Sequence, residues 1–301
     1  MKMLKVKNEK RFKQNLFLIA VFTIPTIHFL VFWLYTNISS ILLAFQNRNG
    51  EFIGLGNFQW YLKDMFSENP TVKAKEGLIN SLRFWLFGRF VETPVALAIA
   101  YFFFKKIKGT DVFNVILYLP SIISSVVMAT VFKNFLSSAG PLASLFEKLG
   151  FGQFPYLLYN SQYAMDTLLF YNFWTGFGTV LILYTSSMRK IPPEVFEAAM
   201  LDGVGMWKEF THIIMPLIWP MFSTMLMLSV GDIFTASGPI LLLTNGEYGT
   251  QTISHTIFQQ YYEYKQVERA AAIGLFYSFI ALPLVLITRW LVNKLDSNAE
   301  Y

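Results

Sequence analysis

Long apolar runs constrain the fold of this chain more than any other feature of its sequence. Crossing about 30 Å of hydrocarbon takes about 20 helical residues, and six runs are that long: residues 16–38, 82–104, 112–132, 164–188, 216–236 and 271–292. Of the 301 residues, 54% are hydrophobic and only 14% are charged, which favours the bilayer over water as the solvent. The sequence therefore predicts an all-α integral membrane protein with six transmembrane helices.

Basic residues predict the orientation of the chain, because Lys and Arg in short loops stay on the cytoplasmic side. They lie before the first run, after the second and fourth runs, and at the end of the sixth run: Lys2, Lys5, Lys7, Lys10, Arg11, Lys13, Lys105, Lys106, Lys108, Arg189, Lys190, Lys208, Arg289 and Lys294. Both the N and C termini are therefore expected in the cytoplasm. This topology accounts for the net charge of +5, so the charge indicates an anionic membrane surface and not nucleic acid as a partner.

The chain is expected to form a single transmembrane domain over residues 1–301. Its basic tail at 1–15 and a loop at 189–215 are predicted to be cytoplasmic, and the segments facing outward are 45–80, 133–163 and 237–270. These outward segments are too short for separate domains.

Signatures of nucleotide and hydrolytic chemistry are missing from the sequence. A P-loop ends in Gly-Lys-Ser/Thr so that backbone amides cradle phosphates, and no Lys here is followed by Ser or Thr. His28, His212 and His255 form no His-Glu-x-x-His pattern, and no Ser lies in a Gly-x-Ser-x-Gly elbow. We therefore expect no enzymatic site, metal site or cofactor in this chain.

The loop at 189–215 interrupts the apolar pattern with charges and turn residues. Pro193 and Glu194 predict a helix start, because proline suits the first turn and an acid complements the helix dipole. Gly203 predicts the turn that ends this helix, and a second helix is expected from about Met206. The loop therefore forms a helix-turn-helix elbow, which is either an amphipathic connector on the lipid surface or a docking knob for a cytoplasmic partner.

A motif runs from this elbow into the fifth apolar run. Its residues are Glu197, Ala198, Ala199, Asp202, Gly203, Phe210, Ile213, Pro216 and Pro220. The pattern resembles the signature loop of binding-protein-dependent ABC transporter permeases. Val204 and Met215 stand where that family usually has Ala and Leu.

A second motif lies in the first outward segment. Residues 52–58, FIGLGNF, and then 80–82, NSL, are similar to the Gly-Leu-x-Asn-Phe and Asn-Thr-Leu signals of sugar permeases of the MalF type. Residues 243–247, LTNGE, depart from the Thr-Gly-Gly-Pro of those permeases. The sequence therefore leaves the kind of sugar open.

The resemblance implies the type I ABC importer permease architecture, also called MetI-like, in a bacterial inner or plasma membrane. It implies that the elbow is a coupling helix seated in a groove of a separate ATPase subunit, with interface residues Glu197, Ala198, Ala199, Asp202 and Gly203. The implied partners are a second homologous permease, two ATPase subunits that bind ATP and Mg, and an extracellular solute-binding protein. The implied activity is import of a sugar or oligosaccharide by alternating access.

Polar and aromatic groups in the fourth and fifth runs predict a solute pathway, because such groups in mid-membrane usually face a cavity. An aromatic face beside hydrogen-bonding groups suits a sugar. The candidates are Tyr171, Asn172, Trp174, Gly176, Ser229 and Asp232. Purely structural roles are equally compatible with these residues. Asn172 would then bond to a neighbouring helix, Trp174 would fill the core, and Gly176 with Gly178 would allow close helix packing.

The sequence is also compatible with two other functions. An ion-coupled secondary transporter would use Asp232, Arg89 and Glu92 for coupling, although it leaves the elbow without a role. Arg89 and Glu92, three residues apart, also suit a structural pair on one helix face. A membrane scaffold that moves no solute would leave the polar residues of the fourth and fifth runs unexplained.

Overall fold

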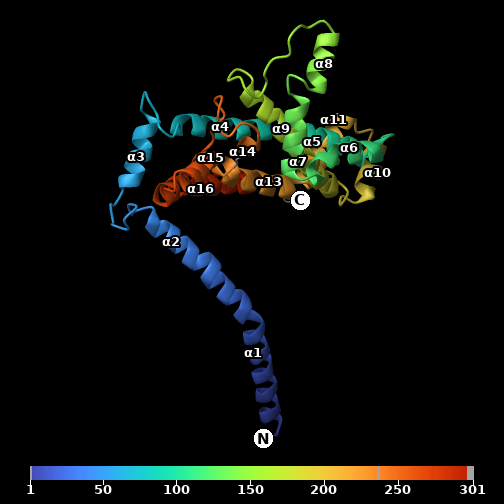
Figure 1. Cartoon of the computed structure of the whole chain (residues 1–301). Helices are drawn as coiled ribbons and strands as arrows, with labels where there is room; N and C mark the ends of the chain where they lie inside the picture. Colours follow the sequence, from blue (N-terminus) through green and yellow to red (C-terminus); the bar gives the residue numbers. More distant parts are fainter. Residues whose placement is uncertain (1, 236–237, 297–301) are drawn as a thin grey trace.

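The computed structural model describes residues 2–235 and 238–296, with side chains at 13–235 and 238–295. Every regular element in these ranges is helical (Figure 1). Four helices are long and apolar enough to cross a membrane, and two bent helix pairs raise the number of candidate spans to six if each pair is one span. The predicted all-α fold is therefore confirmed, whereas the orientation of the termini stays a prediction.

The elements follow the apolar runs closely, and short π-helical or 3-10 turns (η) continue or extend several helices. In the first half of the chain they are α1 (Lys2–His28), η1 (Phe29–Tyr35), α2 (Thr36–Leu43), α3 (Gly56–Met65), α4 (Ala74–Phe87), η2 (Gly88–Glu92), α5 (Thr93–Phe104), α6 (Thr110–Ile122), α7 (Ser125–Phe135) and α8 (Pro141–Lys148). In the second half they are α9 (Ala164–Met188), α10 (Pro193–Leu201), α11 (Met206–Lys208), η3 (Glu209–Ile214), α12 (Met215–Leu217), α13 (Trp219–Gly231), η4 (Asp232–Phe234), α14 (Ile240–Leu243), α15 (Ile253–Phe258), η5 (Gln259–Glu263) and α16 (Val267–Asp296). The fourth run coincides with α9, and the first, second and sixth runs lie within longer helices.

The third apolar run does not form the straight helix expected from its length. It is divided between α6 and α7, which meet at 103°. Pro120 lies in the last turn of α6 and has no N–H to donate, so the helix loses a hydrogen bond there. Ile123 then adopts an extended conformation with ψ of 142°. The span predicted at 112–132 is therefore present as a bent pair of helices.

The fifth apolar run is also bent. The segments Met206–Leu217 and Trp219–Phe234 meet at 70°. Pro216 and Pro220 flank this bend, and neither residue can donate a helical hydrogen bond. The helical path thus begins earlier than the predicted span and connects the elbow at 189–215 to the fifth apolar run. The predicted end of this span, Ala236, lies outside the described residues.

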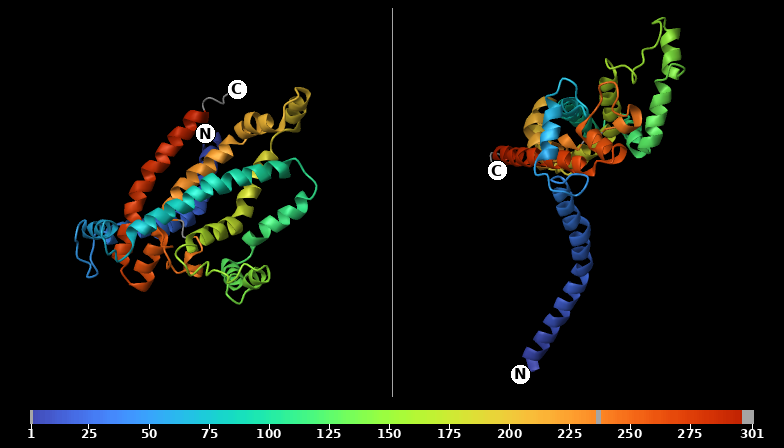
Figure 2. Two further views of the ribbon diagram at one scale, coloured as in Figure 1. Left: turned by 90° about the horizontal axis from the view of Figure 1, so that it is seen from above. Right: turned by 60° about the vertical axis from the view of Figure 1, so that its left-hand side comes forward.

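The first helical span projects away from the other helices at its N-terminal part, α1, whereas α2 at its other end reaches α16 (Figures 1 and 2). The most apolar window of Lys13–Leu43 is 0% buried within the chain, so its side chains are left for lipid or another subunit. The other helices form a bundle with α10 at one end and α3 at the opposite end (Figure 1). One hydrophobic cluster joins side chains of α5, α9 and α10, which anchors the elbow to the bundle.

The residues of the second sequence motif hold the loops after α2 and between α14 and α15 in place. Asn80 Nδ2 donates to the carbonyl oxygens of Gly249 at 2.8 Å and Gln251 at 2.9 Å. Ser81 Oγ accepts a hydrogen bond from the backbone N–H of Ile253 at 3.2 Å. Asn57 Nδ2 similarly donates to two carbonyl oxygens that follow α2. These side chains therefore satisfy loop backbone groups that would otherwise be buried without partners.

Candidate functional site

The elbow predicted at 189–215 is built from α10 and the turn that follows it. Pro193 is the first residue of α10 and Glu194 lies in its first turn, as helix-start chemistry favours. Gly203 has φ of +66°, and its N–H donates to the carbonyl oxygen of Met200 at 3.1 Å. The next N–H, that of Val204, reaches back to Ala199 at 3.0 Å. This is a Schellman end, so the predicted helix and glycine turn are confirmed.

The elbow motif divides between an inward and an outward face of α10. Ala199 is 5% exposed, whereas Glu197 and Ala198 are exposed. Asp202 and Gly203 are exposed at the tip. The exposed face of α10 is therefore available to a partner, and the buried face fixes the helix to the rest of the chain.

Apolar side chains surround the tip of the elbow. Leu201 is 90% exposed and Trp207 is 76% exposed. Met200 and Met206 are exposed beside them in sequence. Grouped exposed apolar side chains mark a surface that meets a protein or a membrane. This surface is therefore compatible both with a connector on the lipid surface and with a docking site for a partner protein.

The inward face of α10 is held by aromatic packing against the end of α5. The ring centroids of Phe196 and Phe104 lie 4.8 Å apart. Next to this contact is a cavity of about 1060 Å³ that lies between α10 and the loop after α5. Its charged lining residues are Lys105, Lys106, Asp111, Arg189 and Glu197.

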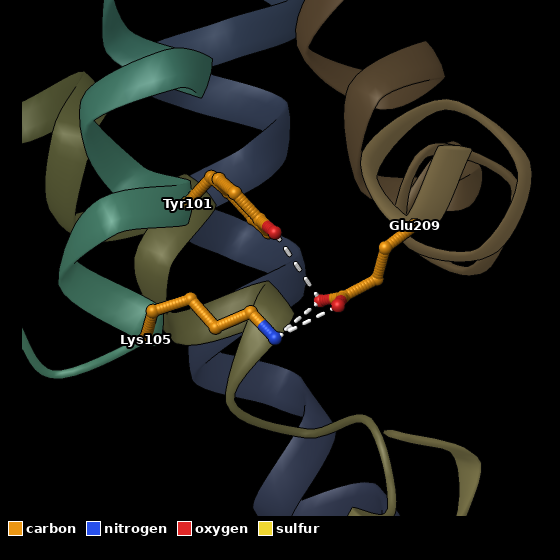
Figure 3. Close-up of polar contacts among 3 residues, drawn as sticks. All are labelled: Tyr101, Lys105 and Glu209. Carbon is orange, nitrogen blue, oxygen red and sulfur yellow. Dashed lines mark hydrogen bonds and ion pairs between the residues drawn. The ribbon is translucent and has the colours of Figure 1, made fainter. Parts of the chain in front are cut away.

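A buried carboxylate ties the second arm of the elbow to α5 (Figure 3). Glu209, the first residue of η3, is 5% exposed. Lys105 Nζ lies 2.6 Å from its Oε1 and 2.8 Å from its Oε2. Tyr101 OH donates to Oε1 at 3.4 Å. Sequence analysis did not single out Glu209, because Lys105 is 104 positions away and opposite charges on two loops do not specify a pair.

Two of the predicted pathway residues belong to an aromatic cluster between α7 and α9. The Tyr171 ring lies 4.8 Å from that of Phe132 and 6.4 Å from that of Trp174. Phe132 and Trp174 rings are 6.1 Å apart. Tyr171 is 4% exposed, while Trp174 is half-buried. Tyr171 is thus a core residue of this chain, and Trp174 lies at the edge of the core.

The two predicted glycines on α9 have different surroundings. A Cβ on Gly178 would lie 2.7 Å from the Leu117 oxygen and from Tyr118 Cα, so this glycine allows close contact between α6 and α9. A Cβ on Gly176 would instead lie 3.7 Å from Glu92 Oε1. Glu92 is 6% exposed, and among the described residues it forms no ion pair with Arg89 within 4 Å. Gly176 therefore borders a buried carboxylate.

The remaining pathway candidates differ in whether their polar atoms are free. Ser229 is buried and donates to Leu226 O of its own helix at 2.7 Å. Asp232 is exposed at the end of α13, where Thr235 Oγ1 lies 3.4 Å from its Oδ1. Asn172 is half-buried, and its side chain has no hydrogen bond within the described part of the chain. Of these three, Asn172 retains the most hydrogen-bonding capacity.

The comparisons with known proteins decide the family. The family described as binding-protein-dependent transport system inner membrane component matches residues 92–300, which is more than half of the chain and includes the whole elbow. The chain belongs to this family. The permease is therefore a membrane subunit of an ABC importer and not itself an enzyme, and it crosses the plasma membrane several times.

Individual relatives agree with this assignment. The arabinooligosaccharides transport system permease protein AraP of Bacillus subtilis (strain 168) is 29% identical over 278 residues, which are 89% of this permease and 86% of AraP. The alpha-glucoside transport system permease protein AglF of Rhizobium meliloti (strain 1021) is 25% identical and aligns over 88% of this permease and 80% of AglF.

A solved structure supports the fold as well. One chain of a bacterial ABC transporter involved in the import of the acidic polysaccharide alginate superposes with a TM-score of 0.82 at 25% identity, covering 95% of this permease and 98% of that chain. The predicted MetI-like permease architecture is thereby confirmed.

Proposed function

We propose that this permease imports a sugar or oligosaccharide in an assembly with a second permease, two ATPase subunits and an extracellular solute-binding protein. AraP is named for arabinooligosaccharides and AglF for alpha-glucosides, and the similar solved structure belongs to an importer of alginate. A second alginate importer structure includes a periplasmic protein bound to a pentasaccharide, although its 24% identity supports only the fold. The substrate class rests on these relatives, and the ATP and Mg are assigned to the partner ATPases.

The coupling role is supported by α10, which has one exposed face and one face buried against the rest of the chain. Its outward face presents Glu197 and Ala198, and the small side chain of Ala198 permits close approach of a partner. Its inward face is fixed to α5 through Phe196. A rigid helix held in this way transmits a displacement to the bundle. We assign Glu197, Ala198, Asp202 and Gly203 to the ATPase interface and Ala199 to the support of α10.

Alternating access needs the membrane helices to respond to that displacement. The elbow continues into the fifth span through the bend of 70° between Leu217 and Trp219, and such a bend can absorb rotation of one arm against the other. Solute would then pass beside α9, where Asn172 offers an unpaired amide and Trp174 an aromatic face. The other candidates are assigned to the helices that border the same pathway: Tyr171, Gly176, Ser229 and Asp232.

The same proposal includes the membrane topology. Residues 1–301 form one permease domain with the basic tail at 1–15 and the coupling loop at 189–215 in the cytoplasm. An ion-coupled secondary transporter is the weaker candidate, because it gives α10 and its exposed apolar tip no partner.

The experiment compares charge reversals at two exposed glutamates in vesicles containing the assembled importer. Glu197→Lys should lower both ATPase co-purification and ATP-driven sugar uptake by about tenfold, with normal insertion of the permease. Glu147→Lys, on exposed α8, is the matched control and should leave both readouts unchanged. Normal ATPase association and uptake in Glu197→Lys would refute the coupling role, and uptake driven by an ion gradient with this chain alone would refute the importer.

A further inference from the structure

The cytoplasmic end of α5 touches both arms of the elbow through one side chain. Lys105 follows the last residue of α5, and its Nζ lies 5.5 Å from the ring centroid of Phe196 on α10. The same Nζ contacts both carboxylate oxygens of Glu209 on η3. Lys105 therefore bridges α5, the helix before the glycine turn, and the helix after it.

The environment of Glu209 makes this contact more than a surface ion pair. Its side chain is 7% exposed, whereas that of Lys105 is 33% exposed. A carboxylate that is removed from water must keep its partners, because an unpaired buried charge is strongly unfavourable. Tyr101 in the last turn of α5 and Lys105 directly after it supply those partners. Glu209 is thus fixed in direction as well as in position.

The location of Glu209 links it to the bend in the fifth span. Glu209 starts the π-helical turn η3, which continues through α12 to the bend before Trp219. Phe210, the next residue, packs on Tyr101 with ring centroids 5.5 Å apart. The apolar contact and the charged contact therefore join the same two segments, and the charged one adds a specific direction.

We propose that Glu209, held by Lys105 and Tyr101, is a positioning residue that makes α5 and both arms of the elbow move as one body. This inference rests on the proposed coupling function. When a partner displaces α10, the Lys105 bridge transfers the displacement to η3 and hence to the bend. Without the bridge, α10 still docks, but part of its motion is lost between the two arms. The expected defect is in coupling and not in assembly.

The test removes both charges together so that no buried charge is left unpaired. Lys105→Met/Glu209→Gln keeps the approximate side-chain volumes and avoids the penalty of a single deletion. The matched control is Lys108→Met/Asp111→Asn, which removes one charge of each sign from exposed positions in the loop after α5 and the first turn of α6. Lys105→Arg is the conservative variant, because arginine retains the charge and the donors to Glu209.

The first readout is solute transported per ATP hydrolysed by the assembled importer. The neutral pair should lower this ratio by about fivefold or more with ATPase subunits still co-purifying, while Lys105→Arg and the control keep the wild-type ratio. An unchanged ratio in the neutral pair overturns the proposal. Equal losses in the neutral pair and the control, or a loss of assembled complex with an unchanged ratio, also overturn it.

The second readout does not depend on the solute. The chain contains no cysteine, so spin labels attached at Lys106→Cys and Lys208→Cys modify no other position. These two residues are next in sequence to Lys105 and Glu209, one on each side of the bridge. The distance distribution between them should broaden in the neutral pair and not in the control, and an equally narrow distribution overturns the bridge. If the wild type shows this bridge but no ATP-driven sugar uptake, the proposed function fails while the structural basis of the inference stands.

Discussion

The side-chain amide of Asn80 holds the loop between α14 and α15, and an aspartate at this position should release it. Asn80 is 2% exposed, and its Nδ2 donates to Gly249 O at 2.8 Å and Gln251 O at 2.9 Å. Asn80→Asp preserves the shape but replaces both donors with an acceptor. The carboxylate oxygens would then face two carbonyl oxygens at hydrogen-bonding distance.

The loss of loop stability in Asn80→Asp depends on how exposed the two carbonyl groups are. Gln251 is 4% exposed, so its carbonyl remains without a partner at a cost of about 1–3 kcal/mol. Gly249 is half-buried and regains part of its loss from water. The loop should therefore be destabilised by about 2–4 kcal/mol, which is about a 30- to 1,000-fold increase in local opening.

The assay is amide hydrogen exchange of the purified permease, followed in peptides that cover residues 247–258. These amides should exchange faster in Asn80→Asp by the factor given above, while amides of α9 stay protected. Asn69→Asp changes an exposed asparagine of the same outward segment and serves as the control. Wild-type exchange of the loop in Asn80→Asp would refute the clamp role of Asn80.

Two further predictions concern helix packing and pH. Gly178→Ala should destabilise the permease by about 1–3 kcal/mol, because the added Cβ would lie 2.7 Å from α6. Its thermal inactivation midpoint should be lower than that of Gly176→Ala, and equal midpoints would contradict this prediction. Burial lowers the pKa of His255 below its ordinary 6.5, with nearby Glu263 opposing the shift. As the pH falls, the unfolded segment around His255 takes up a proton before the folded one does, so the stability of this segment is full above about pH 6.5 and decreases below it. Hydrogen exchange at two pH values should show this dependence, and His255→Gln should abolish it.

The elbow was predictable because its signals are local. Pro193 and Gly203 act on the backbone within one turn of their own positions, so the ends of α10 could be assigned without knowledge of the fold. The role of Glu197 came from resemblance and remains a proposal. The inward direction of Ala199 required the structure, because the same motif contains an exposed Ala198.

The solute pathway was less predictable from sequence. A polar or aromatic residue in a span faces either a cavity or a neighbouring helix, and periodicity does not distinguish them. Tyr171 packs on Phe132 of α7, whereas Asn172 keeps an unpaired side chain within the described structure. Neighbouring residues on one helix therefore differ because α7 packs against Tyr171, while the side chain of Asn172 has no hydrogen-bond partner among the described residues.

The sequence by itself determined the solvent, the helical class and the position of the elbow. The lengths of the apolar runs decide the first two, since about 20 apolar residues match the thickness of the bilayer. Pro120, Pro216 and Pro220 mark in the sequence where the third and fifth spans can bend. Only the tertiary structure decided the angles of those bends, the loop contacts of Asn80 and the pairing of Lys105 with Glu209. Each of these depends on groups far apart in the chain or on competition between a local helix and its packing, which a linear pattern does not record.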